Sequence, residues 1–325
     1  MDLPAIVSGL RHASVPAAVE PRNRWRARRQ AMEAQRRRFT RGGVRRSSAV
    51  SPVVKLAEPL LQLLGWYRQG IRNSLTLGLS EIELFFADLP PAFDGYSILH
   101  FTDLHVRRLP RLMDRIIDRV RDVEADLAVI TGDFQTRGWP SPAEVAADAG
   151  RLASALATRD GVLGVLGNHD HHQIVEPLEA AGVRLLLNEH ITIARGDGTI
   201  GITGLDDVNR FYTPEAERAL RSRQPGRFSL ALVHSVEMAD VAAEAGHALY
   251  LSGHTHGGQI CLPGGRPLFT ALDSHRQLAA GQWQWDRMLG YTSRGVGVGQ
   301  RARFNCPPEI ALLRLRCEPI PALPT

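Results

Sequence analysis

The chain has 325 residues, of which 44% are apolar and 22% are charged, so it can bury a sizeable core in one large domain with an appendage, or in two domains. No apolar run approaches the ~20 residues that a membrane-spanning helix needs, and the N-terminus lacks the apolar stretch typical of a signal peptide. The three cysteines, Cys261, Cys306 and Cys317, form no C-x-x-C pair. This argues against a disulfide framework and a zinc–thiolate site, and favours a reducing, cytoplasmic compartment.

The net charge of +5 is distributed unevenly along the chain. Residues 1–50 hold twelve Arg and three acids, a net +9, so the remaining residues carry −4. The stretch from Arg22 to Arg46 is also poor in large aliphatic residues. We therefore expect residues 1–52 to be a disordered basic arm. The functional alternative is a polybasic segment that contacts an anionic membrane or nucleic acid.

Residues 53–73 are expected to form an amphipathic helix. Leu56, Leu60, Leu64 and Tyr67 recur at helical spacing, and Trp66 near the end is typical of a membrane interface. The pattern fits packing against the body equally well. Together with the basic arm, it favours a peripheral membrane contact through residues 1–72, at the inner face of the membrane.

From Leu75 onward the pattern predicts alternating strands and helices, and therefore an α/β chain. The predicted strands are 82–86, 97–102, 127–131, 162–166, 184–187, 200–203, 228–233 and 248–252. The predicted helices are 112–123, 145–157, 174–181, 214–221 and 236–245.

Five of the predicted strands are followed at once by clusters of Asp, Asn or His. These clusters are Asp103-Leu104-His105, Gly132-Asp133, Gly167-Asn168-His169-Asp170, His234 and Gly253-His254-Thr255-His256. Ligands of α/β sheets gather at the carboxyl ends of strands, so the five clusters are expected to converge.

Imidazole and carboxylate groups together suit divalent Mn, Fe or Zn. A single His after a strand is more often a surface or core residue than a ligand, and a single Gly-Asp is a turn signal. However, seven of the twelve histidines fall in or next to these clusters, which makes coincidence improbable.

The ordered set of motifs resembles the calcineurin-like metallophosphoesterase superfamily. Flanking segments such as Gly257-Gly258-Gln259-Ile260 and Pro308-Glu309-Ile310 resemble sequences of the bacterial predicted-phosphohydrolase branch of this superfamily. Some members of that branch hydrolyse the pyrophosphate of UDP-2,3-diacylglucosamine, and many carry an N-terminal membrane segment. The resemblance implies a metallophosphoesterase domain over residues 74–318, followed by a tail at 319–325. It also implies a four-layer αββα sandwich of two mixed β-sheets flanked by helices.

The resemblance also implies a role for each motif residue. One metal would be bound by Asp103, His105 and His256, and the other by Asn168, His234 and His254. Asp133 would bridge the two metals. His169 would act on the substrate without binding metal, and Asp170 would orient it.

These roles predict hydrolysis of a phosphodiester or pyrophosphate bond by a metal-bridging hydroxide, with a nucleotide-linked or lipid-linked substrate. Arg107 and His171 follow the first and third motifs and are candidate substrate contacts. A nuclease of the same superfamily and a non-enzymatic metal-binding scaffold are the alternatives. The negative charge of the body makes nucleic acid the less favoured partner.

Overall fold

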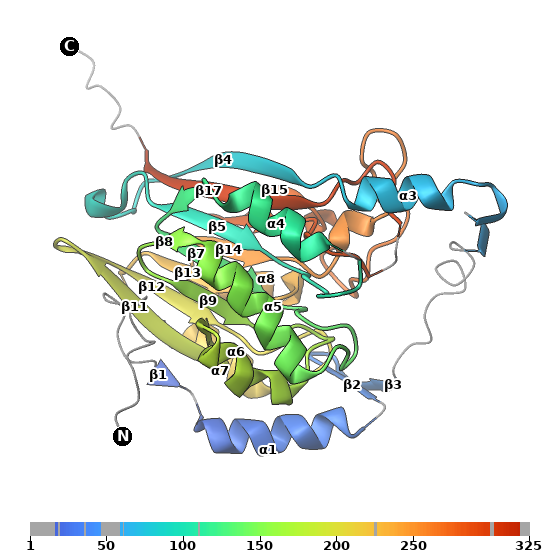
Figure 1. Cartoon of the computed structure of the whole chain (residues 1–325). Coiled ribbons are helices and arrows are strands. Elements are labelled where there is room, and N and C mark those ends of the chain that lie inside the picture. The colour runs from blue at the N-terminus through green and yellow to red at the C-terminus, as the bar shows by residue number, and fades with distance from the viewer. Residues whose placement is uncertain are drawn as a thin grey trace, which may run out of the picture.

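A computed structural model of the chain describes residues 17–18, 20–35, 37–46, 59–60, 62–109, 111–223, 226–299 and 302–318. Figure 1 shows two β-sheets stacked face to face, with helices on their outer faces. The first sheet has six strands in the order β10-β9-β7-β5-β17-β4, and the second has seven in the order β1-β11-β12-β13-β14-β16-β15.

The six-stranded sheet is mixed. It comprises β4 (Gly78–Phe86), β5 (Ser97–Phe101), β7 (Leu127–Thr131), β9 (Val162–Val165), β10 (Val183–Leu185) and β17 (Glu309–Cys317). Strand β17 lies between β4, to which it is parallel, and β5, to which it is antiparallel. From β5 to β10 the strands are parallel, so their carboxyl ends lie at one edge.

The seven-stranded sheet is also mixed. It comprises β1 (Ala17–Ala18), β11 (Glu189–Arg195), β12 (Gly198–Gly204), β13 (Ser229–Leu232), β14 (Leu249–Ser252), β15 (Gly281–Trp285) and β16 (Met288–Thr292). Strands β12, β13, β14 and β16 are parallel, and β11 and β15 run antiparallel to their neighbours.

Three apolar clusters hold the layers together. Between the sheets, side chains such as Ile98, Val129 and Leu313 pack against Ile202 and Leu230. Strands buried on both faces need apolar residues at successive positions, which explains the continuous apolar runs in the sequence.

The helices supply the two outer layers. The cluster on the outer face of the six-stranded sheet includes residues of α4 (Leu112–Val120), α5 (Pro142–Ala155) and α6 (Val175–Ala180). The cluster on the outer face of the seven-stranded sheet includes residues of α7 (Pro214–Arg221) and α8 (Ala239–Glu244). The expected αββα sandwich of two mixed sheets is therefore confirmed.

The N-terminal arm differs from the expectation of disorder. Residues 22–33 form α1 (Arg22–Glu33), which lies along the body (Figure 1). Trp25 and Met32 are buried, and Arg22, Arg26 and Arg29 form ion pairs with acids of the body. The arginines are therefore neutralised by the negatively charged body, which a count of charge along the arm alone does not reveal.

The hairpin β2 (Arg37–Thr40) and β3 (Gly43–Arg46) continues the contact of the arm with the body. The backbone N–H of Phe39 donates to the Arg210 carbonyl, and that of Tyr212 donates to the Phe39 carbonyl. Residues 1–16, 19, 36 and 47–52 of the arm, and the tail 319–325, lie outside the described residues.

Within the described residues, the amphipathic helix expected over 53–73 is interrupted. Helix α3 (Tyr67–Ser74) begins after Gly65, whose φ of 71° is left-handed and ends the preceding helical turn. Residues 53–58 and 61 lie outside the described residues. Among the described residues, no helix has both the length and the apolar character to cross a membrane.

Candidate metal centre

The five motif clusters meet at the carboxyl ends of five strands. Asp103 and His105 follow β5, Asp133 follows β7, and Asn168 follows β9. From the second sheet, His234 follows β13, and His254 and His256 follow β14. Because the two sheets are stacked with these edges together, residues more than 150 positions apart are within hydrogen-bonding distance.

Five of the seven expected ligands have a left-handed backbone. These residues, with φ between 39° and 70°, are Asp103, His105, Asp133, His254 and His256. Positive φ is unfavourable for residues other than Gly, although Asp, Asn and His tolerate it better than most. Strained backbone of this kind clusters at functional sites, where the surrounding structure enforces it.

Two glycines allow the loops to approach one another. A Cβ at Gly167 would lie 2.2 Å from Asp133 Oδ1, and one at Gly253 would lie 2.0 Å from Thr102 Oγ1. Neither position can accept a side chain unless the loop carrying a candidate ligand shifts.

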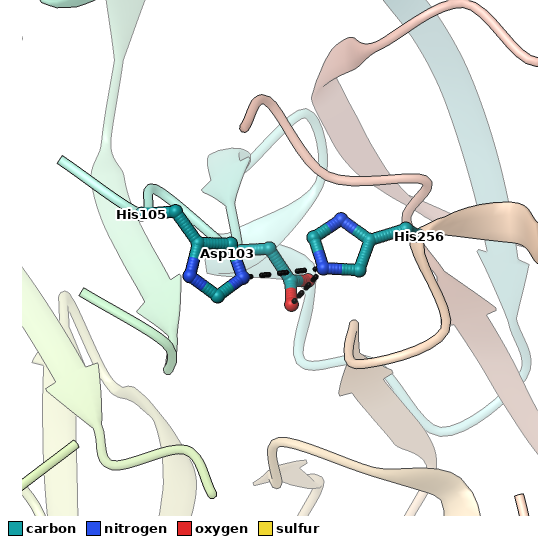
Figure 2. Close-up of side chains that lie close together, drawn as sticks. All are labelled: Asp103, His105 and His256. Atoms are coloured by element: carbon teal, nitrogen blue, oxygen red, sulfur yellow. Dashed lines mark hydrogen bonds and ion pairs between the residues drawn. The ribbon is translucent and has the colours of Figure 1, made fainter. Parts of the chain in front are cut away.

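Figure 2 shows the first group of side chains, Asp103, His105 and His256, pointing toward one another. His105 Nε2 lies 3.2 Å from His256 Nε2, which lies 3.4 Å from Asp103 Oδ1. Donors bound about 2.1 Å from one cation are separated from each other by about 3.0–3.4 Å, so these distances suit a shared cation.

The second group gathers around His234. Its Nε2 atom lies 3.2 Å from Asn168 Oδ1, 3.3 Å from His254 Nδ1 and 3.4 Å from Asp133 Oδ2. Asp133 Oδ2 also lies 3.7 Å from His105 Nε2 of the first group. The Asp133 carboxylate thus stands between the two groups.

Three of the four candidate ligand imidazoles are oriented by a backbone carbonyl at their other ring nitrogen. Nδ1 of His105 and of His234 contacts a backbone carbonyl, that of Gln135 at 2.8 Å and of Thr131 at 2.7 Å. His254 Nε2 contacts the Ala271 carbonyl at 3.3 Å. Such partners fix the orientation of each ring and direct its other nitrogen toward the site, where that nitrogen can bind a metal once it is deprotonated.

The electrostatics of the site fit a cation. Asp103 Oδ1 is buried and has no hydrogen-bond partner among the described residues. Burial lowers the pKa of His234, but the Asp133 and Asp103 carboxylates raise this pKa to about 10. The donor set therefore attracts positive charge strongly, and its oxygen and imidazole donors suit divalent first-row metals.

His169 lies beside the first group without joining it. Its ring centroid is 5.3 Å from that of His105, and its backbone N–H donates to Asp133 Oδ1. Burial lowers the pKa of His169 to about 4, so the ring is neutral near pH 7.

Among the described residues, the Asp170 carboxylate contacts backbone amides rather than the ring of His169, which it was expected to orient. This carboxylate accepts the backbone N–H groups of Asp133, Gln135 and Gly167, at 2.8–2.9 Å. Burial raises the pKa of the Asp170 carboxyl, and the amides of Gln135 and Gly167 oppose that shift. Asp170 therefore ties the second motif to the third.

The two candidate substrate contacts have different surroundings. Arg107 pairs with Glu144 and Asp148 of α5, so its charge is neutralised away from the metal ligands. His171 is half-buried, and its backbone N–H donates to Gln135 Oε1. Of the two, only His171 remains a candidate substrate contact.

Two buried arginines support the site without a motif to identify them. Arg29 of α1 donates to the Asp170 carbonyl at 2.8 Å and pairs with Asp206. Arg303 donates to the His256 carbonyl at 3.1 Å and contacts His256 Nδ1 at 3.4 Å. Nothing in the sequence identifies Arg29 as the partner of Asp206.

Comparison with known proteins gives a consistent result. A model of the family described as calcineurin-like phosphoesterase matches residues 96–258. The uncharacterized metallophosphoesterase YkuE of Bacillus subtilis is 32% identical over 237 residues, covering 70% of this chain and 82% of that protein. The phosphodiesterase YaeI of Escherichia coli is 30% identical over 263 residues, covering 77% and 89%. The uncharacterized metallophosphoesterase YkoQ of Bacillus subtilis is 27% identical over 269 residues, covering 79% and 97%.

The matched segment begins just before β5 and ends just after His256, so it contains all five strand-end clusters. Family, fold and donor chemistry agree, and this chain belongs to the calcineurin-like phosphoesterases, metal-dependent hydrolases of phosphoesters.

Proposed function

We propose that the chain is a two-metal phosphodiesterase or pyrophosphatase that acts on a nucleotide-linked or lipid-linked substrate. The observation that carries the two-metal proposal is the position of Asp133. One of its carboxylate oxygens lies within 3.7 Å of His105 in the first group and 3.4 Å of His234 in the second. A carboxylate can bridge two metals, whereas a neutral imidazole binds one.

In this proposal Asp103, His105 and His256 hold one metal, Asn168, His234 and His254 hold the other, and Asp133 is shared. Two bound divalent cations would lower the pKa of water and neutralise charge on the phosphate. His169 is close enough to the first group to donate a hydrogen bond from its neutral ring to a phosphate oxygen. Asp170 keeps the loops of Asp133 and His169 in register through its three amide contacts.

The substrate proposal rests on less direct support. The Escherichia coli relative is named a phosphodiesterase, which favours a diester or diphosphate over a monoester. A nuclease is less favoured, because arginines of α1 that would contact nucleic acid are paired with acids of the body.

The test is hydrolysis of bis(p-nitrophenyl) phosphate beside p-nitrophenyl phosphate. The full chain is stripped of metal and then supplied with Mn²⁺. We expect diester cleavage that requires metal and falls by about 100-fold or more in Asp133→Asn. Asp197→Asn, an exposed turn residue, is the matched control and should keep full activity.

Metal-independent cleavage, or an active Asp133→Asn enzyme, would refute the two-metal mechanism. A chain that binds two metals and cleaves neither ester, nor a UDP-linked lipid, would instead be a metal-binding scaffold.

We also propose that this cytoplasmic chain contacts the membrane peripherally, through residues next to α3 rather than through the arginines of α1. Leu60, Leu63, Leu64 and Trp66 are exposed, Leu63 to 83%, and Arg68 beside them is also exposed. Exposed apolar side chains next to a basic residue are typical of interfacial contacts.

Flotation with anionic liposomes tests this contact. We expect the full chain to float and Leu63→Gln/Trp66→Gln to float much less, while Val44→Gln, an exposed apolar residue of β3, behaves like the full chain. Equal flotation of all three proteins would reject the contact through residues 60–66.

A further inference from the structure

Three basic side chains lie next to the third motif, on the side where it meets the N-terminal arm. They are Arg137, His171 and Arg210. Among the described residues, neither Arg137 nor Arg210 has a carboxylate within 4 Å, and both lie outside the motifs that place the metal ligands. Arg107, by comparison, pairs with two acids of α5.

Arg137 is held by a tight turn that is anchored to the metal centre. Thr136 and Trp139 exchange backbone hydrogen bonds, and Arg137 and Gly138 between them have φ of 53° and 76°. Thr136 Oγ1 lies 3.0 Å from His105 Nδ1, and the backbone N–H of Gln135 donates to Asp170. The turn therefore has a fixed position relative to the ligand loops.

His171 packs against this turn. A Cβ at Gly138 would lie 3.0 to 3.3 Å from three atoms of the His171 ring, and Gln135 Oε1 accepts the His171 backbone N–H. Only glycine at position 138 allows the ring to approach so closely.

Arg210 reaches the same region from the other sheet. Its guanidinium lies 5.3 Å from the Phe211 ring centroid, and Arg29 lies 3.6 Å from that centroid. Arg29 in turn donates to the Asp170 carbonyl, next to His171. The Nε atom of Arg210 is buried and has no hydrogen-bond partner among the described residues.

The charges of these groups interact. Burial lowers the pKa of Arg210, and the charges of Arg137, Arg29 and Arg38 lower it further, although Asp207 opposes them. Asp206 neutralises Arg29 and Asp273 neutralises Arg38. Arg137 and Arg210 are left without an ion-pair partner among the described residues, although the Asp207 carboxylate acts on Arg210.

We propose that Arg137, His171 and Arg210 form an anion subsite that binds a second phosphoryl group of the substrate while the first lies at the metal centre. This rests on the proposed function and narrows it to substrates with two linked phosphoryl groups. Guanidinium groups bind phosphate oxygens with paired hydrogen bonds, and no carboxylate of the described residues forms an ion pair with Arg137 or Arg210.

The first experiment needs no hydrolysis. Inorganic pyrophosphate is titrated into the metal-free full chain at low ionic strength and binding is followed by calorimetry. We expect Arg137→Asn and Arg210→Gln each to weaken binding by about tenfold, the effect of losing a charge-assisted contact. Asn is chosen at position 137 because it tolerates positive φ.

Arg111→Asn is the matched control, because Arg111 is exposed and also has positive φ, 60°. It should bind pyrophosphate as the full chain does. Arg210→Lys keeps the charge and should recover part of the loss, which separates the role of charge from that of packing on Phe211. No binding by the metal-free chain, or equal binding by all variants, would overturn the subsite.

The second experiment compares substrates in the Mn²⁺-loaded enzyme. Arg137→Asn should lower kcat/KM for a nucleoside diphosphate ester about tenfold more than for bis(p-nitrophenyl) phosphate. Equal losses of kcat/KM for the two substrates would mean that the three side chains bind free phosphate rather than the second phosphoryl group of a substrate. That result would reject the proposal. The chain could also bind pyrophosphate through these arginines and yet hydrolyse neither substrate. That result would support the anion subsite and contradict the proposed function.

Discussion

Two buried arginines support opposite sides of the metal centre, and they are stabilised in different ways. Arg29, from the N-terminal helix, holds the carbonyl of Asp170 and is paired with Asp206 and Glu33. Arg303, near the C-terminal strand, holds the carbonyl of His256 and those of Arg294 and Gly297. Among the described residues it has no ion pair, and burial lowers the pKa of Arg303.

The difference indicates that a ligand loop can be fixed by ion pairs, as at Arg29, or by hydrogen bonds to neutral groups, as at Arg303. Burial lowers the pKa of Arg29, but the carboxylates of Asp206, Glu33 and Asp207 raise this pKa above its usual value. Removing Arg29 leaves the carboxylate of Asp206 buried without its ion-pair partner, whereas removing Arg303 leaves backbone carbonyls and the Nδ1 atom of His256 without a donor. Mutations should therefore distinguish the two arginines, both in the size of the effect and in how it can be reversed.

The largest effect is expected for Arg29→Met. Losing one partner of a buried ion pair typically costs about 3–5 kcal/mol, because the remaining charge stays buried. We expect a loss of unfolding free energy in that range in urea titrations. Adding Asp206→Asn should restore part of it, and a double mutant with no recovery would contradict the charge-network interpretation. Arg26→Met, whose ion pair is exposed, is the control and should cost less than about 1 kcal/mol.

Arg303→Met should have the next largest effect, about 2–4 kcal/mol, because several buried carbonyls lose their donor. Activity should fall as well, since His256 loses the contact that holds its loop. Neutralising Glu309, the acid of the Arg294 ion pair, should give no recovery. If Glu309→Gln did restore stability, Arg303 would depend on charge as Arg29 does. Arg276→Met, exposed with one carbonyl contact, is the control.

The motifs that carry the candidate metal ligands could be identified from the sequence, whereas the supporting residues Arg29 and Arg303 could not. The apolar runs of β5, β7, β9, β13 and β14 end directly at their clusters, so each strand and its ligands are neighbours along the chain. Arg29 lies 177 residues from Asp206, and Arg303 lies 47 residues from His256. Contacts over such separations have no period or spacing by which a single sequence could identify them.

The same limit explains the unexpected order of the N-terminal arm. A run of arginines predicts disorder only if no acids face it, and the acids that pair with Arg22 and Arg26 come from residues 176–189. The position of strand β17 between β4 and β5 could not be predicted either, because β17 pairs with strands that lie more than 200 residues earlier in the sequence. The position of Asp170 next to His169 in the sequence likewise does not reveal the backbone N–H groups that donate to the Asp170 carboxylate.

Asp170→Asn tests whether Arg29 acts through the third-motif loop. An amide offers one acceptor oxygen and a donor group that opposes the backbone N–H groups now bound, so we expect a loss of about 1–3 kcal/mol and a fall in kcat. The fall in kcat in Asp170→Asn/Arg29→Met should be smaller than the product of the two single effects, because both act on one loop. Fully multiplicative effects would separate Arg29 from the loop.

The smallest expected effect is a difference between the two ligand groups in the number of protons released when metal binds. With the pKa of His234 raised to about 10, the metal-free second group carries a proton near pH 7, whereas burial holds the pKa of His256 in the first group well below its usual value. A metal must displace the His234 proton, so its binding to the second group should release about one proton and strengthen up to about tenfold per pH unit below pH 10. Calorimetric titration with Mn²⁺ in two buffers of different ionisation enthalpy measures this release. His190→Gln, a half-buried histidine away from the site, should leave it unchanged. If neither binding event depended on the buffer, the second group would start unprotonated, and the two ligand groups would be electrostatically equivalent despite their different supports.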